Sequence, residues 1–277
     1  MRWEDAAMSS LLGGFQHSSQ IADVTALFRW LDHADGMAPI QQIKRLMLEA
    51  CPISTGDRVL DVGCGVGHEV QRMAQRVGPE GRAVGIDRSE PMIAEARRRA
   101  VSAGLPSEYL VADARHLELA SDMFELCRAE RVLRYIERPE QAVQEMVRVV
   151  RPGGRVVIFD FDADTIVDAP DPPLVRRIAE VLDAAIPSPW VGRQLFRIFK
   201  QVGLTEVSVV PHAAVMTSPH HFPVYRRLVA DTLSCAVEAG QIDASDVARW
   251  WALLEHADRE GVFFTFVLGC IVTGRKP

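Results

Sequence analysis

The chain has 277 residues, of which 48% are hydrophobic and 25% charged, and its formal net charge is −6. A chain of this length buries one good core, or one core with a cap. The negative charge disfavours a nucleic-acid binder, which needs a basic face for phosphates. No apolar run approaches the roughly 18 residues of a membrane span, and the first ten residues, MRWEDAAMSS, are unlike a secretory signal. The five cysteines are scattered, as expected of reduced thiols. We therefore expect a cytoplasmic protein.

Two amphipathic helices are predicted ahead of the first strand. Residues 1–19 have no clean period and are expected to form a loose arm. From Ile21 onward apolar residues recur at helical spacing, and a second helix is expected over residues 39–50. We expect both helices to form a lid, and we assign residues 1–55 to the arm and lid and residues 56–277 to the main domain.

The most informative stretch is residues 59–69, VLDVGCGVGHE. It predicts a buried strand that turns through Gly63, Gly65 and Gly67 into a helix, because glycines allow a left-handed backbone. A dinucleotide fingerprint would place its third glycine one residue later, where a histidine stands, so that fingerprint fails. Asp61, two residues before the first glycine, suits a cation better than a pyrophosphate. S-adenosylmethionine carries an ammonium and a sulfonium and no phosphate, so the loop favours this ligand.

Two further acids follow at the ends of the next two predicted strands. Residues 82–86 form the second strand and lead into Asp87, and residues 111–114 close the third strand around Asp113. An acid at the position of Asp87 can accept hydrogen bonds from both hydroxyls of a ribose. Because ligands bind at the carboxyl edge of an open α/β sheet, we expect Asp61, Asp87 and Asp113 to share that edge. Any one of them alone could simply cap a turn; their common register favours a binding site.

The rest of the chain alternates strands and helices with short links, which predicts a parallel sheet with right-handed crossovers. Two stretches, at about residues 161–189 and 211–260, depart from this alternation, and we expect helical insertions that cap the active edge. The expected helices cover residues 68–77, 91–103, 139–150, 174–185, 190–202, 223–239 and 244–257. The expected later strands cover residues 124–129, 155–160, 205–210 and 263–273.

Five motifs occur in order and at suitable spacing: VLDVGCGVG, GIDRSEPMI, VADA, FELCRAERVLRYI and RPGG. With them the chain resembles the class I S-adenosylmethionine-dependent methyltransferases, over roughly residues 59–154 and the closing strand. The resemblance implies an α/β, Rossmann-like sheet of seven mostly parallel strands in the order 3-2-1-4-5-7-6, with the last strand antiparallel. It also implies methyl transfer from S-adenosylmethionine, with S-adenosylhomocysteine as the product, to a small-molecule acceptor of the natural-product kind.

The resemblance further implies how the cofactor is held at its methionyl and ribose ends. Asp61 would bind the ammonium, directly or through water. The backbone of Gly63, Gly65 and Gly67 would lie against the methionyl part. Asp87 would accept hydrogen bonds from the ribose hydroxyls.

The adenine and the sulfonium have their own implied partners. Arg88 and Met92 would flank the adenine ring, the thioether being a soft partner for a π face. Asp113 would accept a hydrogen bond from the adenine amino group, and the Ala114 amide would donate to a ring nitrogen. The backbone carbonyl of Glu130 would lie under the sulfonium.

The acceptor site is harder to assign from sequence. In many relatives the segment after strand four ends in Leu-x-His, whereas this chain has Leu-Arg-Tyr and ends at Tyr135. Tyr135 is a candidate to orient the acceptor, the alternative being that it only packs. His33, expected at the end of the first lid helix, is a candidate base, the alternative being a solvated helix end. No third ligand stands at helical spacing from His220 and His221, so no metal site is expected.

Two rival functions stay open at this point. The departure at Tyr135 leaves room for a fold relative that uses the same pocket for cyclisation or decarboxylation. A non-enzymatic binding subunit is the other rival, and the intact glycine loop and three acids argue against it. The expected partner is a small-molecule acceptor, without nucleic acid or membrane, and a homodimer is compatible with the sequence.

Overall fold

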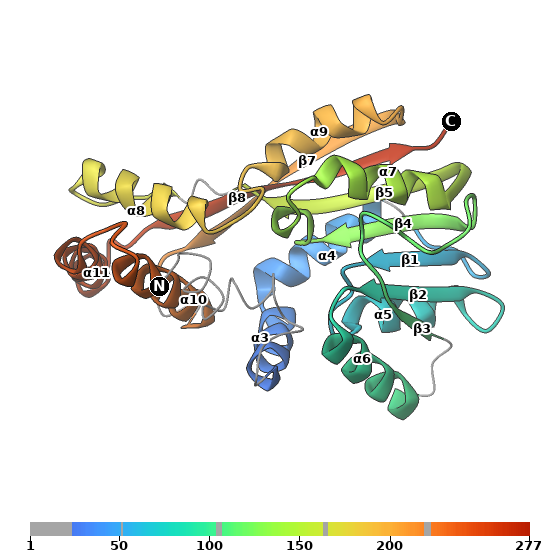
Figure 1. Cartoon of the computed structure of the whole chain (residues 1–277), viewed down its shortest axis with the longest axis horizontal. Coiled ribbons are helices and arrows are strands. Elements are labelled where there is room, and N and C mark those ends of the chain that lie inside the picture. The colour runs from blue at the N-terminus through green and yellow to red at the C-terminus, as the bar shows by residue number, and fades with distance from the viewer. Residues whose placement is uncertain (1–23, 51, 104–106, 163–165, 219–222) are drawn as a thin grey trace.

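The structure is a computed structural model that describes residues 24–50, 52–103, 107–162, 166–218 and 223–277. One sheet carries helices on both faces, and a further group of helices stands at one end of the molecule (Figure 1). The predicted arm over residues 1–19 and the predicted helix start at Ile21 lie outside the described residues, as do His220 and His221. In the part that is described, no helix is both long enough and apolar enough to cross a membrane.

The predicted sheet order is confirmed. Five strands are parallel to one another: β1 (Arg58–Val62), β2 (Arg82–Asp87), β3 (Ser107–Val111), β4 (Phe124–Glu130) and β5 (Val150–Phe161). The closing strand β8 (Thr265–Arg275) runs antiparallel between β5 and β7 (Thr205–Met216), and a two-residue strand, β6 (Ile166–Val167), pairs with the start of β8. With β6 set aside, this is the order 3-2-1-4-5-7-6 with the last strand antiparallel.

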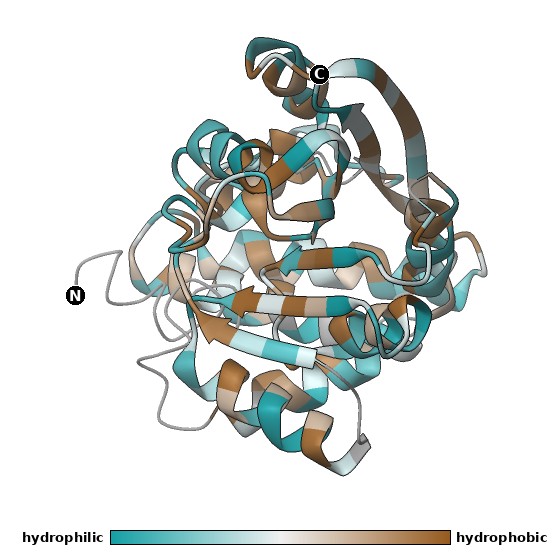
Figure 2. Cartoon of the chain, turned by 90° about the vertical axis from the view of Figure 1, so that its right-hand side faces the viewer, coloured by the Kyte–Doolittle hydropathy of each residue, from teal (hydrophilic) through white to brown (hydrophobic). Residues whose placement is uncertain are grey.

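Helices form a layer on each face of the sheet. Helices α7 (Pro139–Val149) and α9 (Val191–Gln201) cover one face, and α4 (Ala38–Ala50), α5 (His68–Val77) and α6 (Glu90–Ala103) cover the other. Successive residues of a strand point to opposite faces, so Leu60 lies in the first core and Val59 in the second. Figure 2 shows hydrophobic residues along the strands and hydrophilic ones on the outer sides of the helices, as two buried faces require.

Helix α4 differs from the lid that the sequence predicts. Its Ile40, Ile43 and Met47 are buried in the same core as Phe159 of β5. The apolar stripe of α4 thus covers the sheet, because β5 and β8 present a large buried face there. The helix before it, α3 (Thr25–Gly36), lies at the carboxyl edge of the strands (Figure 1).

Strand β7 is longer than predicted. It continues past residue 210 to Met216, paired with β8 as far as Thr265. Pro211 breaks the strand pattern in the sequence, but β7 is an edge strand, where a residue without an N–H is tolerated.

Three helices pack together at the end of the long antiparallel pair of strands β7 and β8 (Figure 1). They are α8 (Pro172–Ala184), α10 (Pro223–Glu238) and α11 (Ala244–Arg259), close to the positions predicted for the insertions. Their apolar faces form a hydrophobic core separate from the two sheet cores, including Leu174, Leu233 and Leu254. We call these three helices the helical cap.

Candidate cofactor-binding site

The glycine loop after β1 has the backbone that its sequence predicts. Gly63, Gly65 and Gly67 have φ values of +73°, +53° and +85°, which other residues rarely adopt. A Cβ on Gly63 would overlap Val132, and one on Gly67 would lie 2.8 Å from the ring of Tyr109. The loop is therefore restricted to glycine both by conformation and by space, and it turns the chain sharply into α5.

Asp87 connects this loop to the end of β2. Its Oδ2 accepts a hydrogen bond from the Gly65 N–H at 3.0 Å, and its Oδ1 accepts one from the Ser89 N–H at 2.9 Å. Burial raises the pKa of Asp87, although these two backbone donors oppose the shift. A carboxylate has about four acceptor positions, so two remain for further donors. The two hydroxyl groups of a ribose, each donating one hydrogen bond, can occupy these two positions.

Asp113 is engaged by its own neighbour. It accepts hydrogen bonds from the Arg115 backbone N–H at 2.8 Å and from the Arg115 guanidinium at 2.7 Å. The hydrogen bond from the Arg115 side chain lowers the pKa of Asp113. Ala114 is partly buried and Arg88 is exposed. Asp113 thus lies just after β3, as predicted, with a bidentate partner that the sequence analysis did not assign.

Helix α3 lies directly over the glycine loop. Leu27 shares a small buried apolar cluster with Val66 of the loop and Met92 of α6. Leu31 comes within 3.2 Å of the position that a Cβ on Gly65 would take. Met92, predicted to flank the adenine, is only 3% exposed beneath this helix. The first of the two predicted lid helices therefore covers the loop.

Beneath the loop lies a network of buried charges that the sequence analysis missed. Its centre is Arg128 of β4, which is 2% exposed. The guanidinium contacts Glu69 at 2.5 Å and Glu130 at 2.6 Å, and its Nε lies 3.5 Å from Oδ1 of Asp61. The sequence did carry one signal of this network. Arg128 lies in the middle of a strand between buried residues, and a buried arginine requires carboxylate partners.

The network also ties the N-terminal helices to the site. Nζ of Lys44, on α4, lies 2.8 Å from Glu69, 3.3 Å from Glu130 and 3.3 Å from Asp35 of α3. Arg72 of α5 contacts Asp35 and Glu69 as well. We call this set the ion network; four acids and four bases make it up: Asp35, Asp61, Glu69, Glu130, Lys44, Arg72, Arg128 and Arg131.

Two acids of the ion network were predicted to serve the cofactor. Burial raises the pKa of Asp61 to about 7, against the opposing charge of Arg128. Burial acts in the same direction on Glu130, but Lys44 and the neighbouring arginines outweigh it and lower the Glu130 pKa. The Glu130 side chain is thus held within the network, which is compatible with a role for its backbone carbonyl. The next residue, Arg131, has φ +59°, a strained backbone placed directly beside the site.

The two catalytic candidates lie on different elements. His33 is exposed in the last turn of α3. Tyr135 ends the short 3-10 helix η2 (Leu133–Tyr135) after β4, where the Arg134 guanidinium carbon lies 5.7 Å from its ring centroid. Burial raises the pKa of Tyr135, so its hydroxyl stays protonated near neutral pH.

Asp160, at the carboxyl end of β5, was not singled out from the sequence. It is completely buried and accepts hydrogen bonds from the Arg134 N–H at 3.2 Å and the Phe161 N–H at 3.0 Å. Burial raises its pKa to about 6. These bonds fix the turn that carries Tyr135. Over the described ranges, no three His, Cys, Asp or Glu side chains gather in a way that could hold a metal ion.

Comparison with known proteins supports the same interpretation. Residues 53–187 match the family described as "Methyltransferase domain". The uncharacterized 37.1 kDa protein in transposon Tn4556 of Streptomyces fradiae is 32% identical over 276 residues, which are 99% of this chain and 77% of that protein. The ubiquinone/menaquinone biosynthesis C-methyltransferase UbiE of Pseudomonas entomophila is 32% identical over 124 residues. That match covers 44% of this chain and 48% of UbiE, about half its length.

A solved structure shares the fold. It is Haemonchus contortus phosphoethanolamine N-methyltransferase 2 in complex with phosphomonomethylethanolamine and S-adenosylhomocysteine. It superposes with a TM-score of 0.60 at 17% identity, covering 100% of this chain and 61% of that one. The sheet order, the glycine loop and these matches lead to one conclusion: the chain belongs to the class I S-adenosylmethionine-dependent methyltransferase superfamily, and S-adenosylmethionine is its cofactor.

Proposed function

We propose that this protein transfers a methyl group from S-adenosylmethionine to a small-molecule acceptor, a specialised metabolite, in the cytoplasm. The observation that carries the proposal is the hydrogen bond from the Gly65 N–H to Asp87. It joins the loop proposed to bind the methionyl part to the acid proposed to bind the ribose, so that both halves of the site are already set relative to each other. Preorganised contacts of this kind reduce the cost of binding.

Each proposed contact uses groups that the fold places at one edge. Arg128 makes its shorter contacts with Glu69 and Glu130, so Asp61 is the one of these three carboxylates whose charge the arginine neutralises least. Asp61 therefore attracts the ammonium of the cofactor. Asp87 accepts from the ribose hydroxyls, and Asp113 and the Ala114 amide bind the adenine edge. Contact of the ring with Arg88 and Met92 requires α3 to shift, because Met92 is covered by that helix.

S-adenosylmethionine, when bound, supplies an electrophilic methyl carbon on its sulfonium. What the chain must then do is position the acceptor in line with that carbon and exclude water. Helix α3 provides the cover through Leu27 and Leu31. The ion network keeps the Glu130 carboxylate in contact with Lys44 and Arg128, which leaves its backbone carbonyl as the group offered to the sulfonium.

The proposed base for an acceptor hydroxyl is His33. It is exposed at the end of the covering helix, whereas the raised pKa of Tyr135 makes that phenol a poor proton acceptor. Tyr135 is therefore assigned to positioning. Residues 56–277 remain the proposed methyltransferase domain, and the packing of α4 against β5 argues that α4 folds with it.

Isothermal titration with S-adenosylmethionine, followed by transfer of a labelled methyl group to candidate metabolites, tests the proposal. We expect one cofactor site per chain and labelled product. Tight binding accompanied by an unlabelled, cyclised or decarboxylated product would replace methyl transfer by the rival chemistry. A folded protein that binds neither S-adenosylmethionine nor S-adenosylhomocysteine would overturn the proposal.

A further inference from the structure

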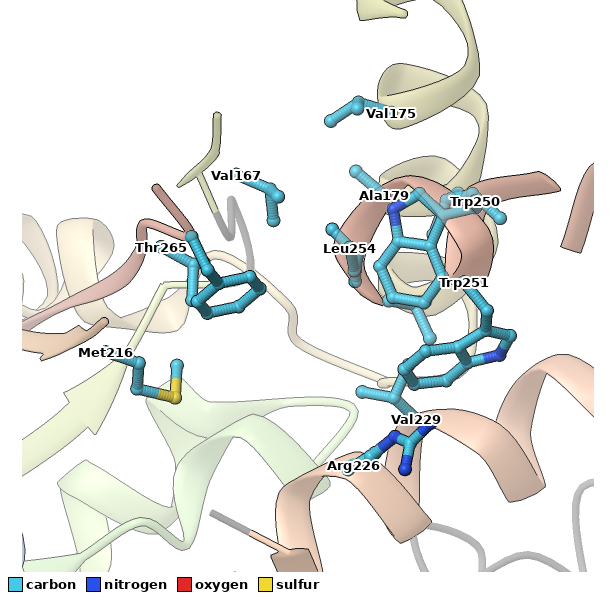
Figure 3. Close-up of a pocket in the computed structure, with 13 residues that line it drawn as sticks. Val167, Val175, Ala179, Met216, Arg226, Val229, Trp250, Trp251, Leu254 and Thr265 are labelled. Carbon is cyan, nitrogen blue, oxygen red and sulfur yellow. The ribbon is translucent and has the colours of Figure 1, made fainter. Parts of the chain in front are cut away.

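The helical cap contains an apolar pocket away from the glycine loop (Figure 3). The empty space within it, counted together with the open solvent at its mouth, is about 620 Å³. Helices α8, α10 and α11 and the ends of β6, β7 and β8 contribute to it. Its apolar lining includes Met216, Val229, Trp250, Trp251, Leu254 and Phe263.

The wall of the pocket offers no uncompensated charge. Arg226 is the charged residue among the described lining residues, and its guanidinium carbon lies 5.1 Å from the ring centroid of Trp251. The same guanidinium contacts Glu255 at 2.7 Å, so its charge is already matched. A neutral, apolar ligand suits such a wall, because a charged ligand would lose its hydration without gaining a free counter-charge.

Trp250 adds a second observation. Its side chain is 5% exposed, and its indole N–H has no hydrogen-bond acceptor in the described parts of the chain. In Figure 3 this nitrogen lies next to Ala179 of α8, at the boundary of the pocket. A buried donor without a partner costs about 1–3 kcal/mol. A ligand oxygen at this boundary would supply the missing acceptor.

The position of the pocket relates it to the proposed reaction. The cap stands beyond the carboxyl ends of β1 and β4, on the side of the sheet where α3 lies (Figure 1). Val167 of β6, which lines the pocket, follows closely after the carboxyl end of β5. The pocket thus lies beyond the same end of the sheet as the glycine loop, but at the far end of the paired strands β7 and β8.

We propose that this pocket binds the apolar body of the methyl acceptor: a neutral, elongated molecule that carries rings or a hydrocarbon chain together with an oxygen atom. Its reactive group extends from the pocket toward the edge formed by the glycine loop. This inference rests on the proposed function, and it adds the chemical class of the acceptor and the surface that recognises it.

The probe for the test is N-phenyl-1-naphthylamine, a neutral dye that fluoresces in apolar sites. Its 8-sulfonate has the same rings and a negative charge, which makes the two a matched pair. Two variants fill the pocket from α8, Ala179→Phe and Val175→Phe, because both residues line it. Ala184→Phe, exposed on the same helix and outside the pocket, is the control.

We expect the neutral dye to bind the wild type and Ala184→Phe at one saturable site, at least tenfold more tightly than the sulfonate. Each pocket-filling variant should weaken dye binding at least tenfold. S-adenosylmethionine affinity should stay within twofold in all four proteins, which also shows that they are folded. Saturating S-adenosylhomocysteine should leave dye affinity unchanged, since acceptor and cofactor must bind together.

Several results would overturn the inference. One is that the wild type shows no saturable dye binding, and another is that the two filled variants bind the dye as tightly as the wild type does. Tighter binding of the sulfonate than of the neutral dye, or displacement of the dye by S-adenosylhomocysteine, would also overturn it. If Ala179→Phe transferred methyl groups at the wild-type rate, the pocket would bind an effector and not the acceptor. Failure of the proposed function is distinguishable, because it appears as absent S-adenosylmethionine binding whatever the dye does.

Discussion

The Nε of Arg128 lies 3.5 Å from Oδ1 of Asp61, and both side chains are buried under the glycine loop. Arg128 makes shorter contacts with Glu69 and Glu130. Asp61 is therefore the carboxylate that the arginine compensates least, and burial raises its pKa to about 7. A site of this kind favours either a proton or an incoming cation, which links cofactor binding to pH.

The affinity for S-adenosylmethionine should rise as pH increases toward 7. Below its pKa of about 7 Asp61 carries a proton and attracts an ammonium weakly, whereas above it the carboxylate is charged. The linkage predicts a gain approaching tenfold per pH unit well below the pKa, which levels off above it. Titrations between about pH 5.5 and 7.5 measure this. Asp61→Asn should bind weakly with a flat profile, and an unchanged slope in that variant would show that another group titrates.

Arg128→Met should destabilise the fold strongly. The substitution leaves Glu69 and Glu130 buried with fewer cations, and breaking a buried ion pair in this way typically costs about 3–5 kcal/mol. Denaturant unfolding of the cofactor-free protein measures the change. Arg98→Met, on the exposed side of α6, is the control and should leave the unfolding midpoint unchanged. Equal midpoints for both variants would mean that the ion network contributes little.

Asp35→Asn should loosen the covering helix without loosening the sheet. Asp35 joins α3 to Lys44 and Arg72, and neutralising it removes both ion pairs. Hydrogen exchange should become faster across α3 and stay unchanged in β1 and β4, and S-adenosylmethionine should dissociate faster. Asp168→Asn, at an exposed position beyond β6, is the comparison. If α3 exchanged at the same rate in Asp35→Asn as in Asp168→Asn, its apolar contacts alone would hold the helix in place.

His33 and Tyr135 should separate in their effects on turnover. If His33 is the base, His33→Gln should lower kcat by roughly 100-fold or more, the usual contribution of such a group. Tyr135→Phe should stay within a few-fold, because the hydroxyl is protonated and the ring is retained. Cofactor affinity measured in parallel serves as the folding control. If Tyr135→Phe lowered kcat more than His33→Gln did, the proton acceptor would not lie on α3.

The sheet and the glycine loop were predictable because their signals are local. Buried apolar runs such as 59–62 specify strands, and the spacing of Gly63, Gly65 and Gly67 specifies the turn. The extension of β7 to Met216 was not predictable, since Pro211 reads as a break and only pairing with β8 overrides it. The alternation of strand and helix predicted a parallel sheet with right-handed crossovers, whereas the order of its strands came from the resemblance to the methyltransferase family.

The ion network escaped the sequence analysis because its members are scattered along the chain. Lys44, Glu69 and Arg128 come from two helices and a strand, and only the packing of α4 on the sheet brings them together. Helix α4 itself was assigned to a lid, because an amphipathic stripe does not reveal which surface it covers. The pocket in the helical cap depends on the mutual packing of α8, α10 and α11, which periodicity cannot specify.

Titration calorimetry of Asp87→Ala with S-adenosylmethionine tests the central claim most directly. Asp87 fixes the loop through Gly65 and is proposed to bind the ribose, and charge-assisted hydrogen bonds contribute roughly 1.5–3 kcal/mol. Glu90→Ala, an exposed acid in the first turn of α6, is the control. The account predicts one site per chain in the wild type, an affinity about tenfold to a hundredfold lower in Asp87→Ala, and no change in the control. Wild-type affinity in a folded Asp87→Ala would contradict it.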